Sequence, residues 1–429
     1  MSVRFMHTAV TAVFALLFCT ISSAQAQDTD SSAMAGDSVV VHRHVFLDGK
    51  RDAWHATLAG NGSGRYFCAW TERTTDGASI RGCFLARAQR SGFHVIEASI
   101  PPAGAEDERP AVVFLDDSTV LLAWQRRENG RHFLRARVVS RFASLGPEQS
   151  VSDDDAGTMT PAAGRTANGA VLLAWQDYRN GNADIYARRF DRDSRPEGRS
   201  VLLNDDGGTA MQGSPQIAAG NGEGPLVFWP DNREDGAWKF YYQRVGVPQA
   251  HNVLIDSAQR KAMTTLISGV LLSGDSALFT WKDYREGHSN IYRRLADLRT
   301  GLLSPAERVN DDRGERWQRL AVAGADGHGR TVICWEDYRH TEINQRGDIY
   351  AQVYDASGLA YGMNLRINDR EDRIARKMPK VFMDDDGWYL VLWHQGEEGR
   401  FHLAGQWLRY PDIREGANFC LTCDPSNEE

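Results

Sequence analysis

The chain has 429 residues, of which 42% are apolar and 25% are charged, so it can bury a substantial core and lacks the composition of a disordered protein. Its formal net charge of −8 argues against nucleic acid or an anionic membrane surface as the main partner. We therefore expect a globular protein that binds no nucleic acid and whose mature part has no membrane span.

The first 26 residues are arranged like a cleavable secretory signal peptide. An apolar stretch from Ala9 to Phe18 follows a basic residue and precedes the small-residue pattern Ala24-Gln25-Ala26. A lipid anchor on Cys19 is an alternative, although the bulky residue before it disfavours lipoprotein processing. The layout predicts a signal peptide at 1–26, a flexible mature N-terminus at 27–37, and a secreted or periplasmic product.

An internal repeat occupies the rest of the chain. Each copy holds an apolar run that ends in tryptophan, and the tryptophans recur every 51 to 58 residues. In the third unit, turn residues separate four short strand-like stretches, at 160–166, 171–175, 184–190 and 200–203. Four strands in about 50 residues make one β-propeller blade. The seven tryptophans, which we expect to wedge between blades, are Trp70, Trp124, Trp175, Trp229, Trp281, Trp335 and Trp393.

These units predict an all-β fold, a seven-bladed β-propeller of four-stranded blades that spans residues 38–418. The last unit, from Met378, has only three strand-like stretches, and the segment Ser38 to Lys50 resembles the missing fourth strand. We therefore expect the N-terminal strand to complete the last blade and close the ring, which would protect the sheet edges. Residues 419–429 are then a C-terminal tail with a CxxC sequence.

Four of the units continue past tryptophan with an aspartate two residues later and an arginine four residues later. Each aspartate is expected to accept backbone N–H bonds in the hairpin turn, and each arginine to reach carboxylates such as Asp205 and Asp311 in the neighbouring connections. A catalytic pair is needed only once in a protein, whereas a pair that stabilises each blade is needed in every blade. The repetition of these pairs therefore favours a structural role. The four pairs are Asp177 with Arg179, Asp231 with Arg233, Asp283 with Arg285, and Asp337 with Arg339.

Acidic turns recur between the units, as in "VSDDDAG", "LNDDGG" and "VNDDRG". The carboxylates at Asp153–Asp155 and Asn204–Asp206 could bind calcium, although they do not follow the layout of an EF-hand loop. We predict no other cofactor or metal, and calcium remains an alternative role for these turns.

The string D-x-R-x-G-x-x-D-I-Y resembles the repeat of TolB-type propellers, and the longer pattern with Trp and NDD is similar to repeats in secreted bacterial propeller proteins, with sialidase-like propellers as further relatives. The W-S-P-D-G element usual in TolB-type repeats is absent. The resemblance covers nearly all of the mature chain. It implies a bacterial extracytoplasmic binding scaffold rather than a particular reaction.

Three units depart from the regular pattern, and ring closure makes them neighbours. The seventh reads "WHQGEEG", the first "WTERTTDG" and the second "WQRRENG". Drift in terminal units is one explanation, and a binding site for a protein or glycan is the other. The candidate rim residues are Glu72, Arg73, Arg126, Arg127, Glu128, His394, Gln395 and Glu397. An enlarged hairpin in unit six gives a second candidate, a binding loop with His340, Glu342, Asn344 and Arg346.

No catalytic residue is predicted. The sialidase box, the G-x-S-x-G elbow and the HExxH helix are all absent from the sequence. We expect a monomeric, non-catalytic scaffold for a protein or glycan partner. The alternatives are a propeller-type hydrolase such as a glycosidase, or a calcium-stabilised adhesion or surface protein.

The cysteines suggest two disulfides. In the hairpin register that sets Trp175 opposite Tyr186, Cys68 lies directly opposite Cys83, and we predict a bridge between them. A local bridge is also expected between Cys420 and Cys423, whereas Cys334 should be a buried thiol.

Overall fold

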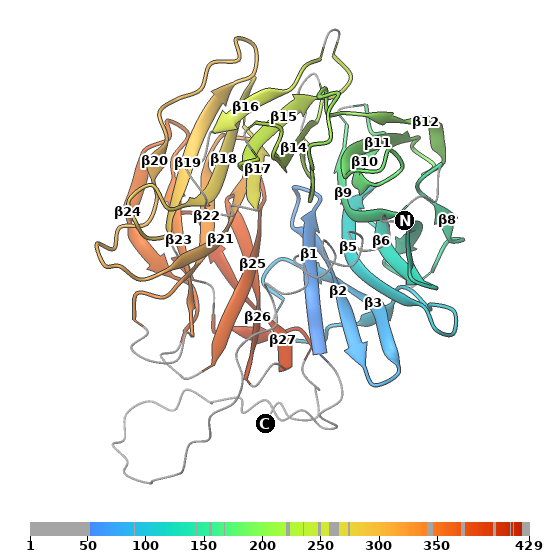
Figure 1. Ribbon diagram of the computed structural model, residues 1–429. Helices are drawn as coiled ribbons and strands as arrows, with labels where there is room; N and C mark the ends of the chain where they lie inside the picture. Colours follow the sequence, from blue (N-terminus) through green and yellow to red (C-terminus); the bar gives the residue numbers. More distant parts are fainter. Residues whose placement is uncertain are drawn as a thin grey trace, which may run out of the picture. The chain divides into compact units, whose positions relative to one another are not determined.

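The computed structural model describes residues 52–89, 91–142, 144–153, 157–166, 168–219, 224–234, 236–247, 250–256, 266–272, 275–340, 346–369, 374–397, 400–411, 413–414 and 416–422. Seven antiparallel sheets, here called blades 1 to 7 in chain order, form a ring (Figure 1), as the repeat predicts. The described residues contain no helix. Consequently, none of them forms a helix that could cross a membrane.

The strands of the first four blades are as follows. Blade 1 holds β1 (Asp52–Gly60), β2 (Arg65–Thr74), β3 (Gly77–Ala86) and β4 (Val95–Glu97). Blade 2 holds β5 (Glu106–Phe114), β6 (Thr119–Glu128), β7 (Arg131–Ser140) and β8 (Gln149–Ser150). Blade 3 holds β9 (Thr158–Arg165), β10 (Val171–Asp177), β11 (Asp184–Phe190) and β12 (Pro196–Leu202). Blade 4 holds β13 (Gln216–Ala218), β14 (Leu226–Asp231), β15 (Lys239–Arg244) and β16 (Val253–Asp256).

The remaining blades follow the same order. Blade 5 holds β17 (Ile267–Leu271), β18 (Ser276–Asp283), β19 (Asn290–Asp297) and β20 (Glu307–Arg308). Blade 6 holds β21 (Gln318–Ala325), β22 (Thr331–Asp337), β23 (Asp348–Tyr354) and β24 (Ala360–Arg366). Blade 7 holds β25 (Ala375–Met383), β26 (Trp388–Glu397), β27 (Arg400–Arg409), β28 (Ile413–Arg414) and β29 (Phe419–Cys420).

The second strand of each blade forms the core between neighbouring sheets. In β10 every residue is buried, which explains why its sequence is apolar on both faces rather than alternating. Trp175 pairs with Tyr186 across the hairpin, as predicted. All seven repeat tryptophans are buried, with at most 1% of their surface exposed. Truncating one of them to alanine should cost about 3 to 5 kcal/mol of stability.

The first strands form the inner ring, because each contacts the first strand of the next blade and β1 contacts β25. In β1, β5, β9, β21 and β25 the pairing register shifts at a bulge. At the same height, six blades carry a non-glycine residue with φ between 46° and 54°, a left-handed conformation that side chains rarely adopt. These residues are His55, Arg109, Thr160, Ser214, Leu320 and Met378.

The fourth strand of blade 7 comes from the C-terminal end of the chain. Leu408 pairs with Arg414 and Ala404 pairs with Cys420, which leaves β28 and β29 along the outer edge of β27. Blade 3 has the same arrangement, where β12 follows the outer edge of β11. This corrects the prediction that an N-terminal strand fills this edge. Ser38 to Lys50 lies outside the described residues, and the supposed tail contributes to the blade.

Among the described residues, side-chain contacts and a backbone hydrogen bond from Asp385 to Gly62 at 3.3 Å join blade 7 to blade 1. Tyr66 donates a hydrogen bond to the buried carboxylate of Asp384 at 2.9 Å, and Arg87 forms an ion pair with the same carboxylate. The backbone N–H of Phe401 donates to Asp52 at 2.6 Å. Both blades also contribute to one apolar cluster that includes Trp70 and Trp407. The ring is therefore closed by packing and hydrogen bonds.

The three predictions about cysteines have different outcomes. Cys68 does lie opposite Cys83, but both are buried free thiols, so the predicted bridge is absent. The Cys83 thiol instead donates to the carbonyl of Phe84 at 3.4 Å, which engages it along its own strand. Cys334 is a buried free thiol, as expected. Cys420 is disulfide-bonded, but Cys423 lies outside the described residues, so their pairing stays a prediction.

Candidate binding site

In the regular blades 3 to 6, the aspartate two residues after the tryptophan stabilises the hairpin. We call this aspartate, with its bonds to the tryptophan and to the arginine of the motif, the fastener. In blade 3, Trp175 Nε1 donates to Asp177 at 2.8 Å, and the backbone N–H of Arg179 donates to the same carboxylate at 3.0 Å. Asp231, Asp283 and Asp337 make the same two bonds in blades 4, 5 and 6. Each of these aspartates therefore accepts the backbone N–H bond that the sequence analysis expects in the hairpin turn.

The arginine of the motif ties its hairpin to the preceding connection. Arg233 forms an ion pair with Asp205 at 2.5 Å, and Arg339 forms one with Asp311 at 2.7 Å, as predicted. Arg179 also stacks on Tyr186, with its guanidinium carbon 4.1 Å from the ring centroid. Burial works against the charged form of Arg179, but the bonds and charge of Asp177 outweigh burial and raise the pKa of the guanidinium.

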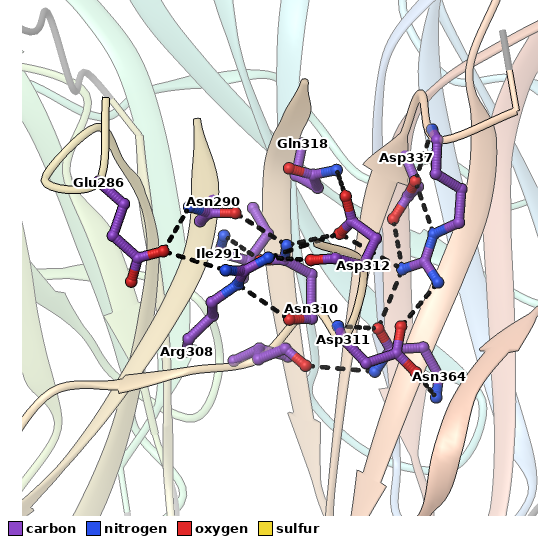
Figure 2. Close-up of polar contacts among 12 residues, drawn as sticks. Glu286, Asn290, Ile291, Arg308, Asn310, Asp311, Asp312, Gln318, Asp337 and Asn364 are labelled. Atoms are coloured by element: carbon purple, nitrogen blue, oxygen red, sulfur yellow. Dashed lines mark hydrogen bonds and ion pairs between the residues drawn. The ribbon is translucent and has the colours of Figure 1, made fainter. Parts of the chain in front are cut away.

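The side-chain oxygen atoms of the acidic turns accept hydrogen bonds from other residues of the protein. Figure 2 shows the turn between blades 5 and 6, where Asn310 accepts from the backbone of Ile291 at 2.8 Å and donates to Asp312 at 2.7 Å. Asp311 accepts from the backbone N–H of Asn364 at 3.0 Å. No group of three or more metal-ligating side chains occurs in the described part of the chain. Asp154 and Asp155 lie outside it, so calcium binding stays a prediction.

Blades 1 and 2 replace the fastener with other ion pairs. Glu72 occupies the aspartate position in blade 1 and binds Arg81 at 3.0 Å. Arg126 occupies it in blade 2 and binds both oxygens of Asp107, at 2.7 and 2.8 Å. As a result, the buried indole N–H groups of Trp70 and Trp124 have no hydrogen-bond partner among the described residues.

Blade 7 retains part of the fastener. Trp393 Nε1 donates to the side-chain oxygen of Gln395 at 3.1 Å, so the amide replaces the carboxylate as acceptor. Gln395 therefore accepts the tryptophan hydrogen bond that an aspartate accepts in the regular blades, but it carries no charge that could pair with an arginine.

The eight predicted rim residues do not form one exposed surface. Glu72, Arg126 and His394 are buried, so the expectation that they face a partner is wrong. Arg73 and Arg127 keep 49% and 50% of their side-chain surface exposed. Glu128 and Gln395 are partly exposed, and the side chain of Glu397 lies outside the described residues.

The two exposed arginines line a pocket of about 350 Å³ at the junction of blades 1 and 2. Arg73 reaches the pocket from β2 and pairs with Glu108 of β5, which crosses the junction. Arg127 reaches it from β6 and pairs with Glu106 at 2.5 Å. The pocket is thus polar, with two partly exposed ion pairs in its wall.

A second set of contacts between blades escaped the sequence analysis. The residue after tryptophan accepts a hydrogen bond from the backbone N–H of the bulged residue in the next blade. Thr71 accepts from Arg109 at 3.1 Å, Gln125 from Thr160 at 3.2 Å, and Glu336 from Met378 at 2.7 Å. A polar residue directly after an apolar run was the signal that could have identified this position.

The predicted binding loop of unit six is only partly described. The ring of His340 lies 6.4 Å from that of Tyr350, centroid to centroid, and Arg346 is partly exposed. Glu342 and Asn344 lie outside the described residues. A binding role for this loop stays a prediction.

No family model and no curated protein matches the chain. Among solved structures it resembles the β-propeller domain of the trilobed protease from Pyrococcus furiosus, which has an open velcro topology. The sequence identity is 11% and the TM-score is 0.51, and the match covers 88% of this chain and 98% of that one. It also resembles a prolyl endopeptidase, at 12% identity and a TM-score of 0.50, and this match covers 85% of this chain and 51% of that one. The match to the Hadza microbial sialidase Hz136 has 12% identity and a TM-score of 0.45, and it covers 80% of this chain and 76% of that one. At these identities the likeness shows the propeller fold alone.

Proposed function

We propose that the protein is a non-catalytic binding scaffold, secreted or periplasmic, that holds a protein or glycan partner where blades 1 and 2 meet. The observation that carries this proposal is the pocket between Arg73 and Arg127. It lies where the repeated fastener is missing, and its arginines are about half exposed. In blades 3 to 6 the arginine one position later in the repeat forms an ion pair with the aspartate of its own hairpin, so it is less available to a partner.

The chemistry of the pocket supports binding better than hydrolysis. A glycoside hydrolase needs a carboxylic acid that donates a proton to the leaving group and a second carboxylate opposite it. Both carboxylates in the pocket, Glu106 and Glu108, form ion pairs with arginines. Such pairs present hydrogen-bond donors and acceptors to a polar ligand, as expected of a surface that recognises sugar hydroxyls or a charged protein face.

The test compares two double variants of the mature protein on a glycan array and on a panel of cell-surface proteins. Arg73→Ala/Arg127→Ala removes the exposed arginines of the pocket. Arg189→Ala/Arg195→Ala is the control, because it removes two exposed arginines from blade 3 that also pair with carboxylates. We expect the first variant to lose at least tenfold in affinity for the wild-type ligand and the control to bind normally.

Two results would overturn the proposal. If both double variants bound the ligand equally well, the binding site would have to lie on another surface. Turnover of a glycoside or peptide substrate that disappears in Glu106→Gln or Glu108→Gln would make the protein a hydrolase.

A further inference from the structure

Residues of blades 1 and 2 line a second pocket, at the opposite end of β2 from the pocket described above. Its volume is about 180 Å³, and its wall includes Arg65, at the start of β2, and Arg141, directly after β7. We call it the Arg65 pocket. Arg73 of the first pocket lies near the other end of β2, roughly 25 Å away at about 3.3 Å per residue. The two pockets are therefore separate.

The Arg65 pocket holds positive charge without a compensating acid. Two arginines and a histidine line it, and none of its described lining residues is an aspartate or a glutamate. Among the residues that the structure describes, none forms an ion pair or a hydrogen bond with the guanidinium group of Arg65 or of Arg141. Arg87, at the same end of blade 1, differs because it pairs with Asp384 at 2.9 Å and with Asp386 at 2.6 Å. An anionic group from a ligand could supply the missing negative charge.

Hydrogen bonds fix the backbone around both arginines. The N–H of Arg65 donates to the side-chain oxygen of Asn61 at 3.1 Å, and the carbonyl of Arg65 accepts from the N–H of Asn61 at 3.0 Å. The N–H of Arg141 donates to the carbonyl of Ser118 at 2.7 Å. The side chain of Gln89, which also lines the pocket, bonds to backbone groups of the segment that follows β3. The pocket wall is thus held in place without using the two guanidinium groups.

Part of the pocket wall is apolar. Phe84 and Ile96 line it, and both belong to or pack against the apolar cluster that contains Trp124. The ring of Phe84 lies 6.2 Å from that of Phe114 in β5, centroid to centroid. The volume of about 180 Å³ is below the roughly 300 to 1,000 Å³ of sites that enclose a whole small ligand. The pocket therefore suits one charged group and a short apolar part beside it.

We propose that the Arg65 pocket binds an oxyanion, a phosphate or carboxylate group that a ligand carries next to a small apolar part. A guanidinium group can donate two parallel hydrogen bonds to such an oxyanion, and the pocket contains the guanidinium groups of Arg65 and Arg141. The imidazole of His94 adds a further N–H donor to the wall. The site is separate from the pocket between Arg73 and Arg127, so the proposal goes beyond the proposed function and does not depend on it.

The test titrates the mature protein with inorganic phosphate and, in a separate arm, with benzoate, by calorimetry at pH 7 and constant ionic strength. Benzoate carries a carboxylate on an apolar ring, so the two arms distinguish a phosphate ligand from a carboxylate ligand. We expect saturable binding in at least one arm. Arg65→Gln and Arg141→Gln should each weaken that binding at least about tenfold, because each removes a charged pair of donors.

Arg131→Gln is the matched control, because Arg131 is an exposed arginine at the other end of β7 from Arg141 and does not line the Arg65 pocket. It removes the same charge and should bind like the wild type. Melting curves check that the variants fold, and Arg141 is exposed, so Arg141→Gln decides the question if Arg65→Gln does not fold. If the wild type bound neither anion saturably, or if Arg131→Gln and Arg141→Gln bound equally, the inference would be wrong.

Discussion

At the scale of single residues, the aspartate that follows the repeat tryptophan by two positions makes several hydrogen bonds within its own hairpin. Asp177 accepts from the indole of Trp175 and from both the backbone and the guanidinium of Arg179, and its side chain is fully buried. Removing one member of a buried ion pair leaves the other charge without compensation, which typically costs about 3 to 5 kcal/mol.

We therefore expect Asp177→Ala to lower the free energy of unfolding by about 3 to 5 kcal/mol, measured by urea denaturation. Asp193→Ala is the control, since Asp193 pairs with Arg195 on the surface with 71% of its side chain exposed. It should change the same quantity by less than about 0.5 kcal/mol. Equal effects of the two substitutions would contradict the fastener role.

The tryptophans of blades 2 and 3 offer a matched comparison. Both are fully buried, but Trp175 donates to Asp177 at 2.8 Å, whereas the N–H of Trp124 has no partner among the described residues. Phenylalanine removes the N–H with a similar loss of volume at each site. Trp175→Phe should therefore destabilise the protein by about 1 kcal/mol more than Trp124→Phe in the same urea experiment. A larger loss at Trp124 would mean that its N–H has an acceptor after all.

At the scale of strands and hairpins, Glu336 links two blades through a buried carboxyl group. It accepts from the backbone of Met378 at 2.7 Å and from the hydroxyl of Tyr338 at 3.2 Å. Burial raises the pKa of Glu336, and these bonds oppose the shift only in part. Because the folded state then holds its proton to higher pH than the unfolded state does, stability is fully present below the ordinary pKa and is lost as pH rises through the raised one.

Glutamine keeps the acceptor for Met378 and cannot ionise, so Glu336→Gln should remove this part of the pH dependence. Urea unfolding at steps from pH 4 to pH 8 should show the variant becoming more stable than the wild type as pH rises. Glu197→Gln, at a surface position with 48% exposure, should run parallel to the wild type. A constant difference between Glu336→Gln and the wild type at all pH values would refute the argument.

The sequence predicts some of these elements much better than others. Tryptophan and the apolar run before it identify every second strand, because that strand is buried on both faces and the pattern must repeat in each blade. The outer strands carry no such pattern. In β12 and β24 most residues are exposed, and β28 is two residues long, which is why the fourth strand of blade 7 was assigned to the wrong end of the chain.

The candidate site was predictable in position but not in detail. A failed repeat motif correctly identifies where Arg73 and Arg127 remain exposed, since no fastener holds them. It also selects Arg126, which a different ion pair buries. The bulged residues of the inner ring, such as Arg109, have no sequence signal, because a left-handed bulge depends on register within the sheet rather than on residue type.

At the scale of the whole molecule, the closed ring depends on the C-terminal segment. Phe419, Cys420 and Leu421 are buried, and Phe419 and Leu421 belong to the apolar cluster shared by blades 7 and 1. The backbone of Leu421 also donates to Leu403 at 2.8 Å, and Thr422 accepts from the backbone of Leu403 at 3.0 Å. This segment therefore covers a sheet edge and fills the junction where the first and last blades meet.

Truncation after Tyr410 should consequently lower the free energy of unfolding by at least about 5 kcal/mol, the sum expected for losing a buried phenylalanine and a buried leucine. Truncation after Asp424 is the control, because it leaves β28, β29 and both cysteines in place and should melt like the full mature chain. Calorimetry or circular dichroism can compare the two. If the shorter chain melts at the same temperature as the control, another segment completes blade 7, and the N-terminal residues predicted from the sequence would be the first to test. If it melts early, the C-terminal segment completes blade 7, as its pairing with β27 indicates.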